Sequence, residues 1–152
     1  MEEALIERAG MEVVTAEYQH RSLPGLSSAA LHGVVVAFYA KVRRDPLLGP
    51  VFDQIIGDEW DAHLEKVCAF WRYATRIDRS YNSRDFIPAH LKHPQIRASL
   101  LPRWIVLFRQ TARELCPDEV AEHLIDIAER MAASIEISLT RRESADVPER
   151  VR

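Results

Sequence analysis

Glycine, cysteine and long apolar runs are all scarce in this chain. Its 152 residues include five glycines and two cysteines. Few glycines mean few tight turns, and no strand-like alternation of apolar residues is present, which together favour helices. Cys68 and Cys116 lie within apolar helical patterns, so we expect reduced core thiols rather than a disulfide framework. No stretch reaches the roughly 18 apolar residues of a membrane-spanning helix.

Further absences narrow the function. Acidic side chains outnumber basic ones by 23 to 20, for a net charge of −3, whereas nucleic-acid binding requires a basic face. The N-terminal residues 1–8 are acidic on balance and lack the apolar run of a secretory signal. The chain has no glycine-rich phosphate loop, no paired-cysteine zinc spacing and no nucleophile elbow. We therefore expect a soluble, cytoplasmic protein with no nucleic-acid and no membrane partner.

Apolar periodicity predicts an all-α fold with about four long helices and one or two short ones. Ser27 or Ser28 should cap the first strong helix, which ends at Asp45 because a residue before proline is pushed out of the α region. Asp58 is the expected N-cap of the next helix. Pro88 should lie in the first turn of a short helix that carries His90, and two more long helices should cover about residues 100–115 and 118–141.

The chain is long enough, and with 47% hydrophobic residues apolar enough, for one domain with a sizeable core. We expect this domain to cover residues 27–141. Residues 1–26 should form an N-terminal extension outside the core, with part of it helical around residues 3–18. Residues 142–152 have no periodic apolar face, which predicts a flexible C-terminal tail.

Four of the remaining side chains could bear chemistry: Tyr39, His63, His90 and Trp104. Two imidazoles, a phenol and an indole directed into an apolar helical core would make a haem pocket, with one histidine on each side of the iron. Neutral imidazole is the common axial ligand of haem iron. Hydroxyl, imidazole and indole groups can donate hydrogen bonds to a partly negative O₂ ligand. Candidate apolar walls are Phe52, Val67, Phe70 and Phe108.

Each of these residues also has an ordinary structural interpretation. A single histidine on an apolar face is more often a hydrogen-bonded core residue, and this applies to His63 and His90 taken alone. Tyr39 and Trp104 would then be core aromatics. The other four histidines are expected at the surface or rim, although one of them, three residues after His90, competes with it as a ligand: His20, His32, His93 and His123.

Six short stretches occur in the order, and near the spacing, that one known family has. They are FYAKVR at 38–43, DPLLGPVF at 45–52, WDAHL at 60–64, FW at 70–71, AHL at 89–91 and RWIVLF at 103–108. From about Leu31 to Leu139 the chain resembles the truncated globins, most closely their third group. The resemblance covers about two-thirds of the chain and implies a two-over-two helical sandwich around a haem.

The resemblance also implies roles for individual residues. His90 would be the proximal iron ligand of haem b, iron protoporphyrin IX. His63 would stand at the distal-histidine position, where it is also a candidate iron ligand. Tyr39, His63 and Trp104 would donate hydrogen bonds to a bound diatomic molecule. The other implied haem-pocket residues are Phe52 at the helical corner, Val67, Phe70 and Trp71 on the distal helix, Phe108, and Lys66 toward a haem propionate.

These residues predict a protein that binds O₂, NO, CO, cyanide or peroxide at ferrous haem iron in a polar distal pocket. Several donors would slow the release of O₂, which favours storage, sensing or scavenging over oxygen transport. Alternatively, donors at the outer oxygen would assist O–O cleavage and give peroxidase-like or nitric oxide dioxygenase activity. Such turnover requires an external reductase as electron donor, because the chain has no room for a fused flavin domain.

Two other classes of protein stay open. Residues 75–85 contain no glycine, whereas truncated globins are glycine-rich there, so one alternative is a haem-free, globin-shaped sensor or interaction domain. The other is a metal-binding helical bundle that uses His63, His90 and His93. That alternative is disfavoured because no carboxylate stands at the Glu-x-x-His spacing expected of di-iron bundles.

Overall fold

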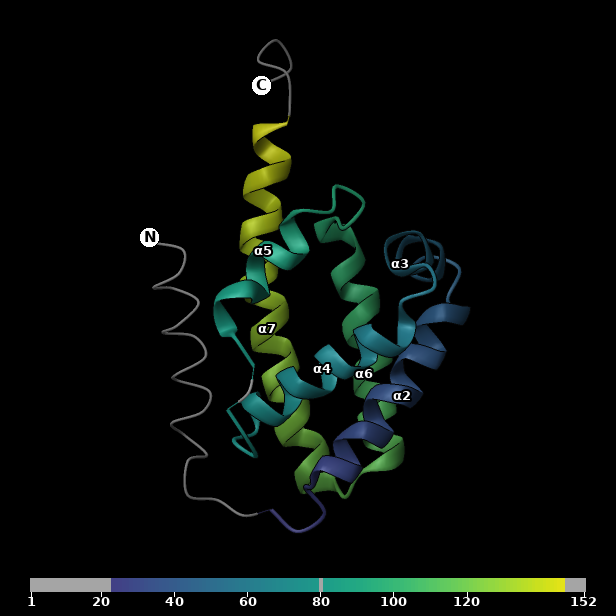
Figure 1. Cartoon of the computed structure of the whole chain (residues 1–152), viewed down its shortest axis with the longest axis vertical. Coiled ribbons are helices and arrows are strands. Elements are labelled where there is room, and N and C mark those ends of the chain that lie inside the picture. Colours follow the sequence, from purple (N-terminus) through teal and green to yellow (C-terminus); the bar gives the residue numbers. More distant parts are fainter. Residues whose placement is uncertain (1–22, 80, 147–152) are drawn as a thin grey trace.

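The computed structural model describes residues 23–79 and 81–146, and every regular element in this part of the chain is a helix (Figure 1). The predicted all-α class is therefore confirmed. The elements are α2 (Ser28–Arg44), α3 (Gly49–Ile56), α4 (Trp60–Ala74), the 3₁₀ helix η1 (Ser83–Asp85), α5 (Phe86–Leu91), the 3₁₀ helix η2 (Ala98–Leu100), α6 (Leu101–Leu115) and α7 (Asp118–Ala145).

Two pairs of long helices form the body of the molecule. Helices α6 and α7 run side by side, while α2 packs against both α6 and α4 (Figure 1). The α2–α4 pair thus lies across the α6–α7 pair, which is the two-over-two arrangement that the sequence predicts. The short helix α5 lies against α7. Among the described residues, no helix has the length and apolar character needed to cross a membrane.

Helix α2 begins and ends where the sequence predicts. Its N-cap is Ser27, whose side chain accepts a backbone N–H three residues on. At its other end the Asp45 carboxylate accepts the N–H groups of Leu47 and Leu48 at 3.1 and 3.0 Å and Arg103 Nε of α6 at 2.7 Å. Burial alone would raise the pKa of Asp45, but these donors hold it below its ordinary value. Asp45 therefore ties the α2–α3 corner to the first turn of α6.

Helix α4 ends in a kind of C-terminal cap that usually contains glycine, but here the cap contains none. Arg76 adopts a left-handed φ of 65°. Its N–H donates to the carbonyl of Tyr73 at 3.1 Å, and the N–H of Ile77 donates to the carbonyl of Arg72 at 2.8 Å. This pair of bonds is the Schellman motif, in which the left-handed residue is usually glycine. The glycine-free segment therefore turns through an arginine in a conformation that favours glycine.

Arg76→Gly is expected to stabilise the protein by about 0.5–1 kcal/mol. Removing the Cβ relieves a left-handed steric cost of about 1–2 kcal/mol, and the added freedom of the unfolded chain offsets part of that gain. The measurement is the free energy of unfolding in urea. The control is Arg84→Gly in η1, where φ is not positive and stability should fall. If the Arg76→Gly variant is no more stable than wild type, the prediction that the cap is strained is wrong.

Four placements differ from the sequence predictions. Leu23 is 8% exposed and belongs to the core, because the turn that it begins leads directly into α2. Helix α4 has Glu59 rather than Asp58 as its N-cap residue. Helix α7 continues through residues 142–145, which were expected in a flexible tail. His123 is 6% exposed rather than at the surface or rim, since α7 packs against several other elements at once.

The remaining predictions for the two ends of the chain fall outside the described residues. These are the helix expected around residues 3–18, the surface position of His20, and the flexible character of residues 147–152. His32 is exposed and His93 is half-buried, as expected for surface or rim histidines. The two cysteines are free thiols, with Cys68 buried and Cys116 half-buried.

Candidate functional site

Tyr39 of α2 and His63 of α4 lie in contact with each other, next to α3. Their ring centroids lie 5.1 Å apart with the planes at 89°. Phe52 of α3 lies 5.9 Å from the Tyr39 ring. Trp60 lies 5.7 Å from both the Tyr39 and the His63 rings. Tyr39 and Trp60 are buried, while His63 and Phe52 are half-buried, so the cluster borders the core.

Trp104 is connected to this cluster through Phe38. The Phe38 ring lies 5.0 Å from Tyr39 and 5.4 Å from Trp104, with edge-on geometry in both cases. Trp104 is half-buried at the start of α6, close to the Asp45–Arg103 ion pair. The structure therefore brings Tyr39 and His63 into direct contact and places Trp104 one aromatic ring away from them.

His90 is held by a single short hydrogen bond within its own helix. Its Nδ1 lies 2.6 Å from the carbonyl oxygen of Phe86, one turn earlier in α5. Because a carbonyl can only accept, Nδ1 bears the proton and Nε2 keeps a free lone pair. Metal-binding histidines are oriented in this way, with one ring nitrogen donating to a carbonyl and the other left for the metal.

The Phe86 ring links the His90 helix to α4. It lies 5.1 Å from the His90 ring and stacks on Phe70 at 5.1 Å and 14°. Phe70 is buried and was expected to contact haem from the distal helix. In the structure it reaches across to α5 and supports Phe86, the residue whose carbonyl orients His90. Tyr81 also packs edge-on against Phe70, at 5.4 Å.

Burial keeps the polar groups of this region uncharged at neutral pH. It is the main cause that lowers the pKa of His63 to about 4, with smaller effects from His90 and Lys66. Burial likewise lowers the pKa of His90 and raises that of Tyr39. The electrostatic effect of His90 on His63 indicates that the two imidazoles lie in one region although they come from different helices. Both rings are neutral there, and the phenol keeps its proton.

Two buried nitrogen atoms in this region lack a hydrogen-bond partner among the described residues: His63 Nε2 and Trp60 Nε1. A buried polar atom left unpaired costs roughly 1–3 kcal/mol, so these two nitrogen atoms need an explanation, and a bound ligand that pairs with them is one. The residues fit a haem. His90 Nε2 would offer a lone pair to the iron, His63 Nε2 would be free to meet a second ligand, and aromatic rings would supply apolar contacts.

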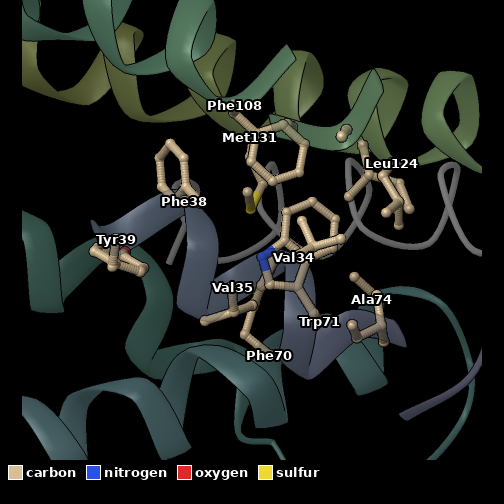
Figure 2. Packing of buried hydrophobic residues seen from close by; sticks show 14 of the residues in the cluster. Val34, Val35, Phe38, Tyr39, Phe70, Trp71, Ala74, Phe108, Leu124 and Met131 are labelled. Atoms are coloured by element: carbon tan, nitrogen blue, oxygen red, sulfur yellow. The ribbon is translucent and has the colours of Figure 1, made fainter. Parts of the chain in front are cut away.

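The other predicted haem contacts divide into core and border residues. Trp71 and Phe108 are 4% and 1% exposed, and their rings stack in parallel at 5.1 Å and 1°. Figure 2 shows this pair beside Phe38, with Tyr39 at the edge of the group. Val67 is half-buried against the core, and Lys66 is exposed. Phe108 and Trp71 therefore belong to the main core as well as to the predicted pocket.

Two residues at this site were not predicted to have a functional role. Trp60 appeared only within the stretch WDAHL at 60–64, and Phe86 was not assigned at all. Helical spacing could have identified both, because Trp60 precedes His63 by three residues and Phe86 precedes His90 by four. Trp60 is also covered by the Arg43 guanidinium, 4.5 Å above its ring.

The alternative of a metal-binding bundle is wrong. Across residues 23–79 and 81–146, no three histidine, cysteine, aspartate or glutamate side chains gather in a group that could hold a metal ion. His63, His90 and His93 all lie within those ranges and do not form such a group.

Comparisons with known proteins point to one family. No family model matches the sequence. Over 99 residues the chain is 29% identical to the group 3 truncated hemoglobin ctb of Campylobacter jejuni, covering 63% of this chain and 77% of that protein. The structure resembles the crystal structure of group III truncated hemoglobin from the same organism, with a TM-score of 0.71 and 24% identity, covering 78% of this chain and 95% of the other.

Proposed function

We propose, from the premise that this chain is a truncated globin homologous to the group 3 truncated haemoglobins, that it binds haem b and a diatomic ligand such as O₂. The family and fold predicted from the sequence are confirmed by these matches. The homology implies a haem cofactor. The observation that supports the finer proposal is the pairing of an anchored His90 with a buried, unpartnered His63 Nε2.

On the proximal side we assign the iron ligand to His90. The hydrogen bond from Nδ1 to Phe86 fixes both the tautomer and the ring orientation. Burial favours the neutral ring, and only a neutral imidazole can bind iron through a lone pair. Phe86 packs edge-on against the His90 ring and itself stacks on Phe70, which restricts movement of the His90 ring.

On the distal side we assign hydrogen bonding to Tyr39, His63 and Trp104. Ferrous haem, when bound, supplies an open coordination position for O₂, NO or CO. Tyr39 keeps its hydroxyl proton because burial raises its pKa, so it can donate. His63 stays neutral with one ring nitrogen free of protein partners. Trp104 lies one ring farther away, behind Phe38. Several donors facing one ligand favour slow release over rapid transport.

The test is the absorption spectrum of the full-length protein titrated with haemin. We expect saturation at one haem per chain, a sharp Soret band, and further band shifts when the reduced protein meets CO or O₂. Haemin that stays in its free form, with no saturable change in absorbance, would overturn the proposal. It would instead favour a haem-free sensor or interaction domain.

Tyr39→Phe is expected to raise the O₂ dissociation rate constant of the ferrous protein about tenfold to a hundredfold. A hydrogen bond to a charged or partly charged acceptor contributes about 1.5–3 kcal/mol, and the substitution removes the hydroxyl while keeping the ring contacts. Stopped-flow displacement of O₂ by CO measures this rate. The matched control is Tyr73→Phe, because Tyr73 lies near the C-terminal end of α4 and packs on Tyr81. Equal rates in wild type and Tyr39→Phe would assign the main donor to another residue.

A further inference from the structure

Arg142, in the last turn of α7, donates hydrogen bonds to three backbone carbonyls in the segment that follows His90. Its Nη1 donates to the carbonyl oxygens of Leu91 and His93, each at 3.0 Å, and its Nη2 donates to that of Ile96. Arg142 is half-buried. One guanidinium thus holds both the end of α5 and the loop after it.

The next residue on α7 adds a second attachment to the same loop. Glu143 Oε1 accepts the backbone N–H of Ala98 at 3.3 Å and pairs with Arg97 Nε at 3.1 Å. Its side chain is 19% exposed, so it lies against the protein rather than in solvent. The last turn of α7 therefore holds the chain continuously from Leu91 to Ala98.

Helix α5 depends on such an attachment. It has six residues, and a helix this short is not stable by itself in water. Of the carbonyls in its last turn, those of Pro88 and His90 accept the N–H group of the C-cap residue Lys92, and that of Leu91 accepts Arg142. A cation at a helix C-terminus is also favoured by the helix dipole. His90 is the second-last residue of α5, so a displacement of Leu91 would move His90.

We propose that Arg142 is a positioning residue for His90, and that the end of α7 clamps the helix that carries His90. This rests on the proposed function, because it assigns a purpose to the clamp only if His90 binds iron. A rigid fork with several N–H donors suits three diverging carbonyls, whereas a lysine ammonium is a point charge on a flexible stem. Arg142→Lys therefore keeps the charge and loses the geometry.

The experiment compares wild type, Arg142→Lys and Arg109→Lys as full-length proteins. Arg109 is the matched control, because it joins α6 to Glu129 of α7 at 2.6 Å, away from α5. Three quantities are measured: hydrogen exchange of the amides between Leu91 and Ala98, the rate of haem transfer to an excess of haem-free acceptor globin, and the iron–histidine stretching band in resonance Raman spectra. For Arg142→Lys we expect faster exchange, haem loss faster by about tenfold to a hundredfold, and a shifted or broadened band.

Each other outcome overturns the proposal in a recognisable way. Unchanged exchange in Arg142→Lys would mean that the clamp does not hold the loop. Faster exchange with unchanged haem loss and an unchanged iron–histidine band would mean that the loop is held but His90 is not positioned by it. Equal effects in Arg109→Lys would indicate general destabilisation. If wild type takes up no haem, the proposed function fails first, and with it the role of the clamp. Glu143→Gln provides a second variant, for which we expect the same three changes at smaller magnitude.

Discussion

His90→Gly is expected to remove the Soret band that haemin produces with the wild-type protein. His90 offers the one ring nitrogen in the candidate site that is both oriented by a backbone hydrogen bond and free to bind a metal. Substitutions of residues that only support a metal ligand lower affinity about tenfold to a hundredfold, so loss of the ligand should exceed that range. Haemin titration monitored by absorbance measures the change in affinity.

Two controls make this result specific. Imidazole added to His90→Gly should restore much of the band, because it can occupy the space that the side chain leaves and supply the same nitrogen. His93→Gly removes the half-buried histidine three residues later and should keep its haem. If His93→Gly loses haem and His90→Gly retains it, the proximal assignment is wrong and His93 is the ligand.

Local patterns in the sequence predicted most of the fold. Leu31, Val34, Val35 and Phe38 recur at the i, i+3, i+4, i+7 spacing of one helical face, and all four are buried on α2. Ser27 and Asp45 marked the ends of that helix because their capping chemistry acts within a few residues. Such signals are readable from sequence, since the partners lie one helical turn apart.

Long-range contacts could not be predicted in the same way. The hydrogen bond from Arg142 to Leu91 joins residues 51 positions apart, and nothing in the charged sequence around Arg142 indicates a carbonyl partner. The ion pair of Asp45 with Arg103 spans 58 positions. Residue type alone therefore placed Arg142 in a flexible tail, while tertiary packing makes it part of the last helix.

The glycine-free loop gave the haem-free alternative its main support, and the structure weakens that argument. A truncated globin with glycine after α4 would turn there at little conformational cost. Here Arg76 adopts the left-handed conformation and completes both Schellman hydrogen bonds. The chain thus leaves α4 through a turn that usually contains glycine, with backbone strain at Arg76 in place of glycine.

Phe108→Ala is expected to destabilise the haem-free protein by about 3–5 kcal/mol. Phe108 is 1% exposed, and its ring contacts Trp71, Trp104 and Phe38 at centroid distances of 5.1, 5.9 and 5.4 Å. Truncation leaves a cavity between both helical layers, which stacked rings cannot fill without losing their own contacts. For a domain of this size the unfolding temperature should fall by roughly 6–20 °C.

The haem-free state is the informative one for Phe108, because it separates a core residue from one that only contacts the cofactor. If Phe108 only lined the haem cavity, its truncation would cost little stability in the haem-free protein but would greatly lower the affinity for haem. Because Phe108 stacks on Trp71, we expect the opposite: the haem-free protein loses stability, and haem affinity falls only as a consequence of that loss. Leu115→Ala is the control on the same helix, since Leu115 is 53% exposed and should change stability by about 0.5 kcal/mol or less. A loss below about 1 kcal/mol in haem-free Phe108→Ala would assign Phe108 to the haem wall instead.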